Sequence, residues 1–196
     1  MNINVVRSKR KSLLINVDDF GDVKVNAPIN ISNDKIYQFI KSKENWINKH
    51  VLKKQAVIYE FSEVLNNKKG LLFGKIVNIF ENFDKYLRKT ASEYLPSRIQ
   101  YLSNKFNLKY KSLTIKNYKS RWGACDKNNN IFLNYKLVSL DSRLIDYVII
   151  HELCHTKEFN HKYNFHKMLS SFFEDEKLLK ENLKKFSFVT KLSYKK

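Results

Sequence analysis

The sequence predicts an α+β protein, in which short strands and helices occupy separate stretches of the chain. Apolar and polar residues alternate over residues 13–27, which indicates strands, whereas apolar residues recur at helical spacing over residues 34–52 and 83–106. The chain has 196 residues, of which 43% are hydrophobic and 14% aromatic, so it can bury a core. A wholly disordered chain is therefore excluded.

The amino-terminal third is predicted to form a β-hairpin followed by a helix. Two strands, at residues 13–17 and 23–27, flank a turn that contains Gly21. Ser32 is a suitable N-cap, and the apolar residues that follow it at helical spacing predict a helix from about Asp34 to Leu52.

The middle of the chain is interpreted as a turn, a strand and a long helix. Residues 66–70 have the composition of a turn, and the β-branched and aromatic residues of 71–80 favour a strand. Helical spacing of apolar residues predicts a helix from Phe83 to Phe106, which Pro96 is expected to kink or restart.

Two short strands and a buried helix are predicted next. Residues 113–115 and 131–133 are the candidate strands, and an Asp- and Asn-rich turn at 126–130 precedes the second. Asp141 or Ser142 is the predicted N-cap of a helix that is apolar on almost every side, as core helices are. We expect a small antiparallel sheet beside this helix.

The charge of the chain makes nucleic acid a candidate partner. The net charge is +18, and residues 96–124 contain cations without any acid. Such a surface attracts polyanions nonspecifically. Most of the cations are Lys, however, whereas base-specific interfaces rely on Arg, so an ordinary solvated surface is the alternative explanation. The cations of the acid-free stretch are Arg98, Lys105, Lys109, Lys111, Lys116, Lys119 and Arg121.

The protein is expected to be cytoplasmic. No apolar stretch approaches the ~20 residues that a membrane helix needs. The apolar run that follows the basic residues 7–11 is too short for a signal peptide. The two cysteines, Cys125 and Cys154, fit a reducing compartment without a disulfide framework. No membrane partner is expected, and the sequence does not indicate an oligomeric state.

The buried helix carries the pattern His-Glu-x-x-His. His151 and His155 lie on one face of a helix, so both imidazoles can aim a nitrogen at one ion. Glu152 lies beside these ligands, where its carboxylate can take a proton from a zinc-activated water. Two imidazoles and a carboxylate on an apolar helix would be costly to bury without a shared partner. We therefore expect one catalytic zinc ion per chain.

A third zinc ligand must come from later in the chain. His161 follows His155 closely enough for the helix to end near Phe159 and turn through Asn160, which tolerates left-handed geometry. His166 is an alternative ligand. Glu174 and Glu176 are a second alternative, as carboxylate ligands from a later helix.

Other candidate site residues have simpler explanations. Cys154, on the buried helix, is interpreted as a core residue, and Cys125 could bind a metal only if the fold brought it close. Asp146 either accepts a hydrogen bond from a ligand imidazole or is an ordinary exposed acid on the helix.

Four stretches of the chain form a linked set of motifs: Ser120-Arg121-Trp122-Gly123-Ala124-Cys125, Ile131 to Leu137, Ile145 to His155, and Asn160-His161 with Phe165. Together they resemble a known family, the YgjP-like metallopeptidases, which are zinc-dependent hydrolases related to the SprT and WLM groups. The resemblance covers nearly the whole chain. One position departs from it, since His166 stands where the family commonly has Trp.

The resemblance implies a fold, a site and an activity. It implies a zincin-like catalytic domain at residues 96–196, preceded by a hairpin and helix region at 1–95, and we expect the two regions to form one compact unit. His151, His155 and His161 would be the zinc ligands, with Glu152 as general base. Arg121, Trp122 and Cys125 match a family signature, for which we expect simple packing in the case of Trp122.

The sequence therefore predicts a zinc metallopeptidase that cleaves a peptide or protein substrate. We expect the strands at 113–115 and 131–133 to supply a sheet edge to which a peptide adds. The alternative function is a nucleic-acid-binding module with structural zinc, or a DNA-associated protease of the SprT and WLM type. A non-peptide hydrolase that uses the same site is a third interpretation.

Overall fold

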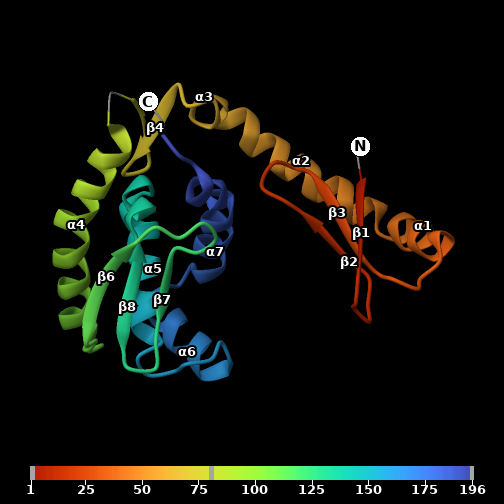
Figure 1. The fold of residues 1–196 in the computed structure, drawn as a ribbon. Coiled ribbons are helices and arrows are strands. Elements are labelled where there is room, and N and C mark those ends of the chain that lie inside the picture. Colours follow the sequence, from red (N-terminus) through yellow and green to blue (C-terminus); the bar gives the residue numbers. More distant parts are fainter. Residues whose placement is uncertain (1–2, 80–81, 195–196) are drawn as a thin grey trace. The chain divides into compact units, whose positions relative to one another are not determined.

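The computed structural model describes residues 3–79 and 82–194, and it confirms the α+β class. The chain divides into two compact units, residues 1–62 and 63–196 (Figure 1). The boundary expected between residues 95 and 96 lies inside helix α4 (Phe83–Phe106). None of the helices in the described ranges combines the length and the apolar character that a membrane span requires.

The first unit contains a three-stranded sheet in which β3 (Val23–Pro28) is central. The predicted hairpin is confirmed, because β2 (Leu14–Val17) pairs antiparallel with β3 and Ile15 lies opposite Val25. A further strand, β1 (Ile3–Ser8), pairs parallel with β3 and was not predicted. The buried face of this sheet packs around Val25, Ala27 and Ile36.

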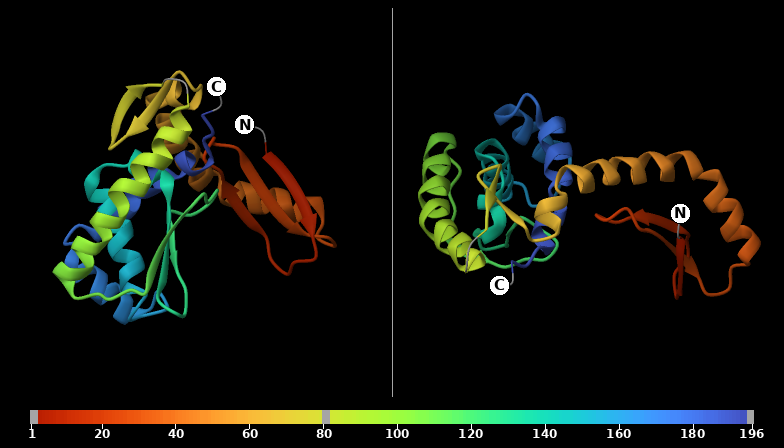
Figure 2. Two further views of the ribbon diagram at one scale, coloured as in Figure 1. Left: turned by 60° about the vertical axis from the view of Figure 1, so that its left-hand side comes forward. Right: turned by 90° about the horizontal axis from the view of Figure 1, so that it is seen from above.

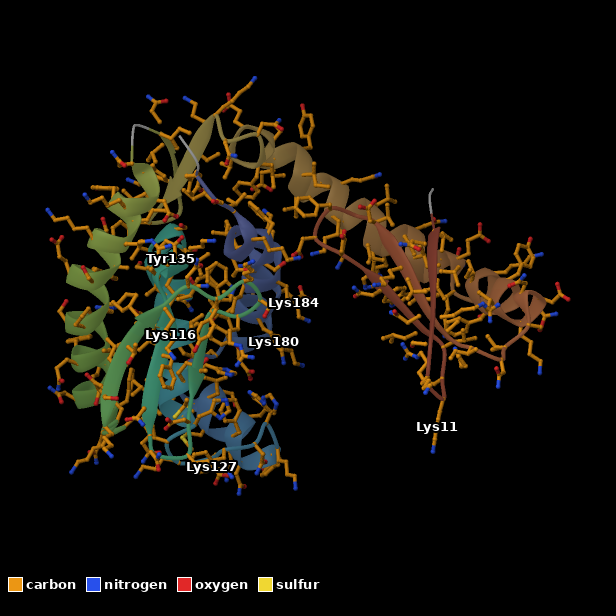
Figure 3. The ribbon with its side chains drawn as sticks, viewed as in Figure 1. Lys11, Lys116, Lys127, Tyr135, Lys180 and Lys184 are labelled. Atoms are coloured by element: carbon orange, nitrogen blue, oxygen red, sulfur yellow. The ribbon has the colours of Figure 1, made fainter. Side chains whose placement is uncertain are left out.

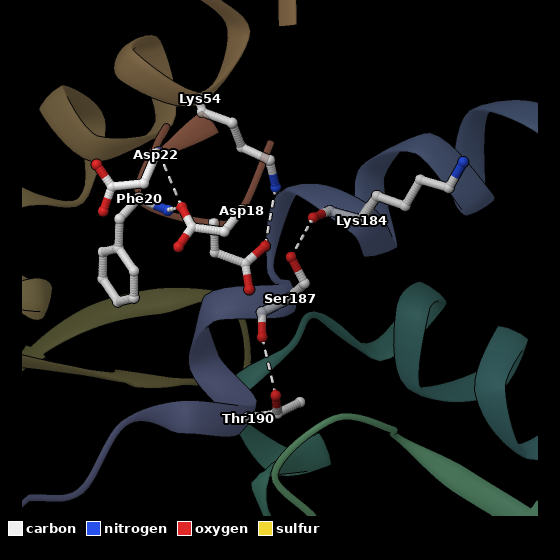
Figure 4. A network of polar contacts seen from close by, with 8 residues as sticks. Asp18, Phe20, Asp22, Lys54, Lys184, Ser187 and Thr190 are labelled. Atoms are coloured by element: carbon white, nitrogen blue, oxygen red, sulfur yellow. Dashed lines mark hydrogen bonds and ion pairs between the residues drawn. The ribbon is translucent and has the colours of Figure 1, made fainter. Parts of the chain in front are cut away.

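The hairpin turn is held by side-chain hydrogen bonds (Figure 4). The Asp18 carboxylate accepts hydrogen bonds from the backbone N–H groups of Phe20, at 2.8 Å, and Asp22, at 3.0 Å. Gly21 has a φ of +84°, a conformation that favours glycine. Lys54 forms an ion pair with Asp19 at 2.9 Å, which ties helix α2 (Glu44–Glu60) to this turn.

The single helix predicted from Asp34 to Leu52 is wrong in its extent, because the structure has two helices there. α1 (Asn33–Ser42) ends at Lys43, whose φ of −110° and ψ of 8° interrupt the helix before α2 begins. The predicted N-cap is confirmed, since Ser32 Oγ accepts a hydrogen bond from the Lys35 N–H at 3.4 Å. A short helix, α3 (Ser62–Leu65), follows α2.

The single strand predicted over residues 71–80 is also wrong, and residue 80 lies outside the described residues. The chain instead forms a hairpin of β4 (Lys69–Leu72) and β5 (Lys75–Asn78). Gly74, with a φ of +76°, turns the chain so closely against Asp141 that a Cβ would lie 2.9 Å from the Asp141 Cβ. The turn is anchored because the Phe73 N–H donates to the Val138 carbonyl at 2.7 Å.

Helix α4 runs without interruption through Pro96, so the predicted restart does not occur. It packs against helix α5 (Ser142–Cys154) and against the 3₁₀ helix η1 (Tyr135–Ser139) (Figure 2). Its buried residues follow a helical period that includes Leu87, Ala91 and Leu95.

A second three-stranded sheet lies beside α5. Its order is β6 (Ser112–Lys116), β8 (Asn130–Asn134), β7 (Gly123–Cys125). The two predicted strands correspond to β6 and β8, whereas β7 was not predicted. β6 and β8 are parallel and β7 is antiparallel to β8, so the sheet is mixed where an antiparallel one was expected.

The last part of the chain packs on α5 and completes the second unit. Of the two N-cap candidates, Asp141 caps α5, because its carboxylate accepts from the Leu144 N–H at 2.9 Å. Helices α6 (Tyr163–Phe172) and α7 (Glu176–Lys185) both pack against α5. The 3₁₀ helix η2 (Ser187–Lys191) follows and contacts η1. Helix α5 is therefore the central element of this unit.

Candidate metal centre

Three imidazoles converge at the carboxyl end of α5. The Nε2 atoms of His151 and His155 each lie 3.1 Å from Nε2 of His161. One ligand atom from each histidine falls within 4.8 Å of the other two, an arrangement that could hold a metal ion. His151 and His155 share a face of the helix because they are four residues apart.

The chain returns to the helix through a short loop that presents His161. α5 ends at Cys154, so the predicted end near Phe159 is wrong. The Thr156 N–H donates to the Leu153 carbonyl and the Lys157 N–H to the Cys154 carbonyl, both at 3.0 Å, which turns the chain early. Asn160 lies in this loop as expected, and its side chain accepts from the Lys162 N–H at 3.1 Å.

A backbone carbonyl orients one of the three rings. His155 Nδ1 lies 2.9 Å from the Glu158 carbonyl oxygen. Because a carbonyl oxygen only accepts, Nδ1 must be the protonated nitrogen and Nε2 carries the free lone pair. This hydrogen bond therefore prepares His155 to bind a cation through Nε2.

Phe165 of α6 supports all three imidazoles from an apolar position. Its ring centroid lies 4.9 Å from that of His151, 4.5 Å from that of His155 and 4.7 Å from that of His161. Phe165 is fully buried. Its sequence spacing gave no indication of this role, because the contact depends on how α6 packs against α5.

The alternative third ligands lie outside this group. The ring centroid of His166 is 6.5 Å from that of His161, and its Nδ1 contacts the Glu176 carboxylate at 3.5 Å. Glu176 is thus engaged with His166, and Glu174 is exposed in the loop before α7. Within the described residues, the cluster that could hold an ion consists of His151, His155 and His161.

Desolvation favours the neutral form of two of the imidazoles, His151 and His161. Desolvation, and then the neighbouring His155 and His161, lower the pKa of His151 from 6.5 to about 3. Desolvation and neighbouring imidazoles also lower the pKa of His161. Neutral imidazole is the form that binds zinc, and three such nitrogens aimed at one point match the ligand set of a catalytic zinc site. The donor set therefore fits a zinc ion.

Glu152 is buried directly under strand β7. A Cβ built on Gly123 would lie 2.7 Å from Glu152 Cγ and 2.8 Å from Oε1, so a side chain at this position would collide with the carboxylate. Desolvation raises the pKa of Glu152 to about 8, and the charge of Arg121 opposes this rise. Gly123 is therefore a site residue, although the sequence indicated it only as part of a motif.

The neighbouring signature residues Trp122 and Cys125 are wholly or partly removed from solvent. Trp122 is buried, as expected, and its carbonyl accepts from the Asn134 N–H at 2.8 Å. Burial, then the charges of Glu152 and Asp126, raise the pKa of Cys125 to about 11, so its thiol stays protonated at neutral pH. Cys154 is fully buried, in agreement with its predicted core position.

Asp146 does not contact the candidate ligands through any observed hydrogen bond. Its carboxylate accepts hydrogen bonds from Arg98, including one from Nε at 2.6 Å, and the two form an ion pair. This bidentate pair links α4 to α5. The expectation that Asp146 is either a partner of a ligand or an exposed acid is therefore wrong, because Arg98 comes from a distant part of the sequence.

Comparison with known proteins identifies the family. Residues 11–81 and 76–186 match the model of the YgjP-like metallopeptidase domain. The chain belongs to the YgjP-like family. A metallopeptidase is a hydrolase that uses a metal and acts on peptide or protein substrates, and this is the class of the present protein.

Two crystal structures are similar to part of this YgjP-like chain. One is the metallopeptidase zymogen abylysin of Pyrococcus abyssi, with 20% identity, a TM-score of 0.40, and coverage of 43% of this chain and 87% of that chain. The other is the zymogen jannalysin of Methanocaldococcus jannaschii, with 26% identity, a TM-score of 0.38, and coverage of 44% and 88%. None of the curated proteins compared with the chain matches it.

The burial of Glu152 predicts how the stability of the metal-free protein depends on pH. The folded-state pKa of Glu152 is about 8 and its ordinary value is 4.5, so the folded state binds the extra proton between these values. The contribution of Glu152 therefore lowers the free energy of unfolding as the pH rises from about 4.5 through 8. Glu152→Gln should remove this loss and raise the free energy of unfolding near pH 8 by on the order of 2 kcal/mol.

Urea unfolding of the chelator-treated protein at pH 5 and pH 8 measures this difference. Glu181→Gln, an exposed position on α7, is the matched control and should leave the pH dependence unchanged. Equal pH dependence of the wild type and Glu152→Gln would contradict the burial of an unpaired carboxyl.

Proposed function

We propose that this protein is a zinc peptidase with one zinc ion per chain, held by His151, His155 and His161, and with Glu152 as general base. The observation that carries the proposal is the convergence of three imidazole Nε2 atoms beside a buried glutamate. The family supports the peptidase class. A cytoplasmic location is part of the proposal, and the free thiols of Cys125 and Cys154 are consistent with it.

Each group of the site has a separate role in the proposed mechanism. Zinc, when bound, supplies a Lewis acid that polarises the scissile carbonyl and acidifies a water molecule. Glu152 takes the proton from the attacking water and passes it to the nitrogen of the leaving amine. The Glu158 carbonyl holds His155 in the tautomer that leaves Nε2 free, and Phe165 fixes the three rings in place.

Strand β7 is the edge that a peptide substrate would pair with in this proposal. The sequence offered residues 113–115 and 131–133 for this role. The first of these lies in β6, which is an edge strand, whereas the second lies in β8, which is central and has no free edge. β7 is an edge strand of its sheet, and its Gly123 lies against Glu152. A peptide that adds to β7 through backbone hydrogen bonds would pass beside the general base.

Glu152→Gln tests the proposed mechanism. The amide is similar in size to the carboxylate but cannot accept the proton, so the rate of peptide hydrolysis should fall by about 10³-fold or more. Zinc content, measured by mass spectrometry on the same samples, should stay at the wild-type value because the three imidazoles are intact. Hydrolysis at a rate similar to that of the wild type would exclude Glu152 as the base.

A second candidate function is nonspecific binding of nucleic acid, as the alternative reading of the charge suggested. Phe132 lies on the sheet face opposite to the buried Ile131 and Leu133, and Lys116 Nζ is 4.1 Å from its ring centroid. Lys116 belongs to the stretch of residues 96–124 that contains no acid. A cation over an aromatic ring is suited to a phosphate and a stacked base.

The dependence of DNA affinity on salt concentration tests this second function. If the sheet face binds single-stranded DNA, affinity should fall log-linearly with salt, and Lys116→Ala should reduce the slope by about 1. Fluorescence anisotropy with a labelled oligonucleotide gives both values, with Lys75→Ala on β5 as the control. Absence of binding at low salt would remove this candidate.

A further inference from the structure

The loop of residues 117–122, which leads into β7, is held by a buried side chain from β8. This loop connects β6 to β7. Asn134 is fully buried, and its amide nitrogen donates to the Tyr118 carbonyl at 2.8 Å and to the Arg121 carbonyl at 3.0 Å. Both N–H groups of the side-chain amide are therefore used to fix the loop.

A second anchor of the loop comes from η2, which lies beyond residue 186, where the match to the family model ends. The hydroxyl oxygen of Thr190 lies 2.9 Å from the Lys119 carbonyl oxygen and 2.9 Å from the Ser187 carbonyl oxygen. Figure 4 shows the contact with Ser187. Because a hydroxyl has one hydrogen, Thr190 donates a shared hydrogen bond that joins η2 to the loop.

A buried lysine fixes η2 in turn. Lys136 Nζ donates to the Thr190 carbonyl at 2.8 Å and to the Leu192 carbonyl at 2.5 Å. Lys136 is only 4% exposed, and an ammonium removed from water is costly unless it is hydrogen-bonded. The preceding residue, Tyr135, is labelled in Figure 3. Its hydroxyl donates to the Asp84 carboxylate of α4 at 2.6 Å, so the element that holds η2 is itself anchored.

The loop ends directly above the general base of the proposed mechanism. Its last carbonyl, that of Trp122, accepts from the Asn134 N–H at 2.8 Å. The next residue, Gly123, pairs with Leu133 of β8. Gly123 lies so close to Glu152 that a Cβ on the glycine would be 2.7 Å from the glutamate Cγ. A displacement of the loop therefore changes how β7 covers the carboxylate.

We infer that Thr190 and Lys136 are positioning residues of the peptidase site, which act through the loop of residues 117–122 to keep β7 over Glu152. Within the described part of the chain, the hydrogen bonds of both side chains go to backbone carbonyls, so they influence the reaction through the backbone. A displacement of about 1 Å in a catalytic geometry can cost on the order of 100-fold in rate. This inference rests on the proposed peptidase function.

Removal of the Thr190 hydroxyl tests the inference. Thr190→Val keeps the size of the side chain but loses the donor, so the amides of residues 117–122 should exchange with solvent about fivefold faster, as measured by hydrogen-exchange mass spectrometry. kcat for a peptide substrate should fall about tenfold, whereas KM should change less than about threefold because β7 stays paired with β8. Thr190→Ser keeps a hydroxyl and should restore both values towards those of the wild type.

Two further variants separate positioning from general stability. Ser103→Ala on α4 is the matched control, because the buried Ser103 hydroxyl donates to the Leu108 carbonyl at 2.7 Å. It should lower the urea midpoint as Thr190→Val does, but leave loop exchange and kcat unchanged. Lys136→Met removes the ammonium and keeps an unbranched apolar stem, so it should release η2 and reproduce both effects of Thr190→Val.

The outcomes distinguish this inference from the proposed function. Unchanged loop exchange in Thr190→Val and Lys136→Met would overturn the anchoring, and faster exchange with unchanged kcat would overturn the positioning role. Either result leaves the peptidase function intact. If the wild type cleaves no peptide, the proposed function fails, and hydrogen exchange alone decides whether η2 anchors the loop.

Discussion

The structure of the second unit depends on the convergence of three imidazoles at the end of a buried helix. Polar groups removed from water destabilise a fold unless they find partners, and here the half-buried His151 faces the exposed His161 across 3.1 Å. Their lowered pKa values express this cost. A bound cation would satisfy all three nitrogens at once, so the same feature that weakens the metal-free fold prepares it for a metal.

The elements around α5 are arranged to keep this cluster in place. Phe165 from α6 contacts every ring of the cluster, and the loop after α5 fixes His155 through the Glu158 carbonyl. The missing side chain of Gly123 lets β7 approach Glu152. β7 therefore covers Glu152, the proposed general base, and is also an edge strand of its sheet.

Local patterns in the sequence predicted those features that local physics determines. The hairpin of β2 and β3 follows from alternation around Gly21, and the shared face of His151 and His155 follows from the helical period. Features that depend on distant contacts were missed. β1 pairs with β3 across the hairpin, where Arg7 donates to the Ile29 carbonyl at 2.9 Å and the Ile31 carbonyl at 2.6 Å.

Other errors have equally specific causes. The break at Lys43 does not interrupt the apolar period, so two helices were taken for one. The apolar run of 71–79 conceals a turn at Gly74, which is set by packing against Asp141. β7 is only Gly123–Cys125, too short for alternation to be recognised, and Asp146 turned out to pair with Arg98 from another helix.

The metal content of three purified proteins tests the central claim most directly. Wild type, His161→Ala and His166→Ala are loaded with zinc, desalted side by side and analysed by inductively coupled plasma mass spectrometry. The account predicts about one zinc per chain in the wild type and in His166→Ala, and a large loss in His161→Ala. Full zinc in His161→Ala together with its loss in His166→Ala would contradict the three-imidazole site described above.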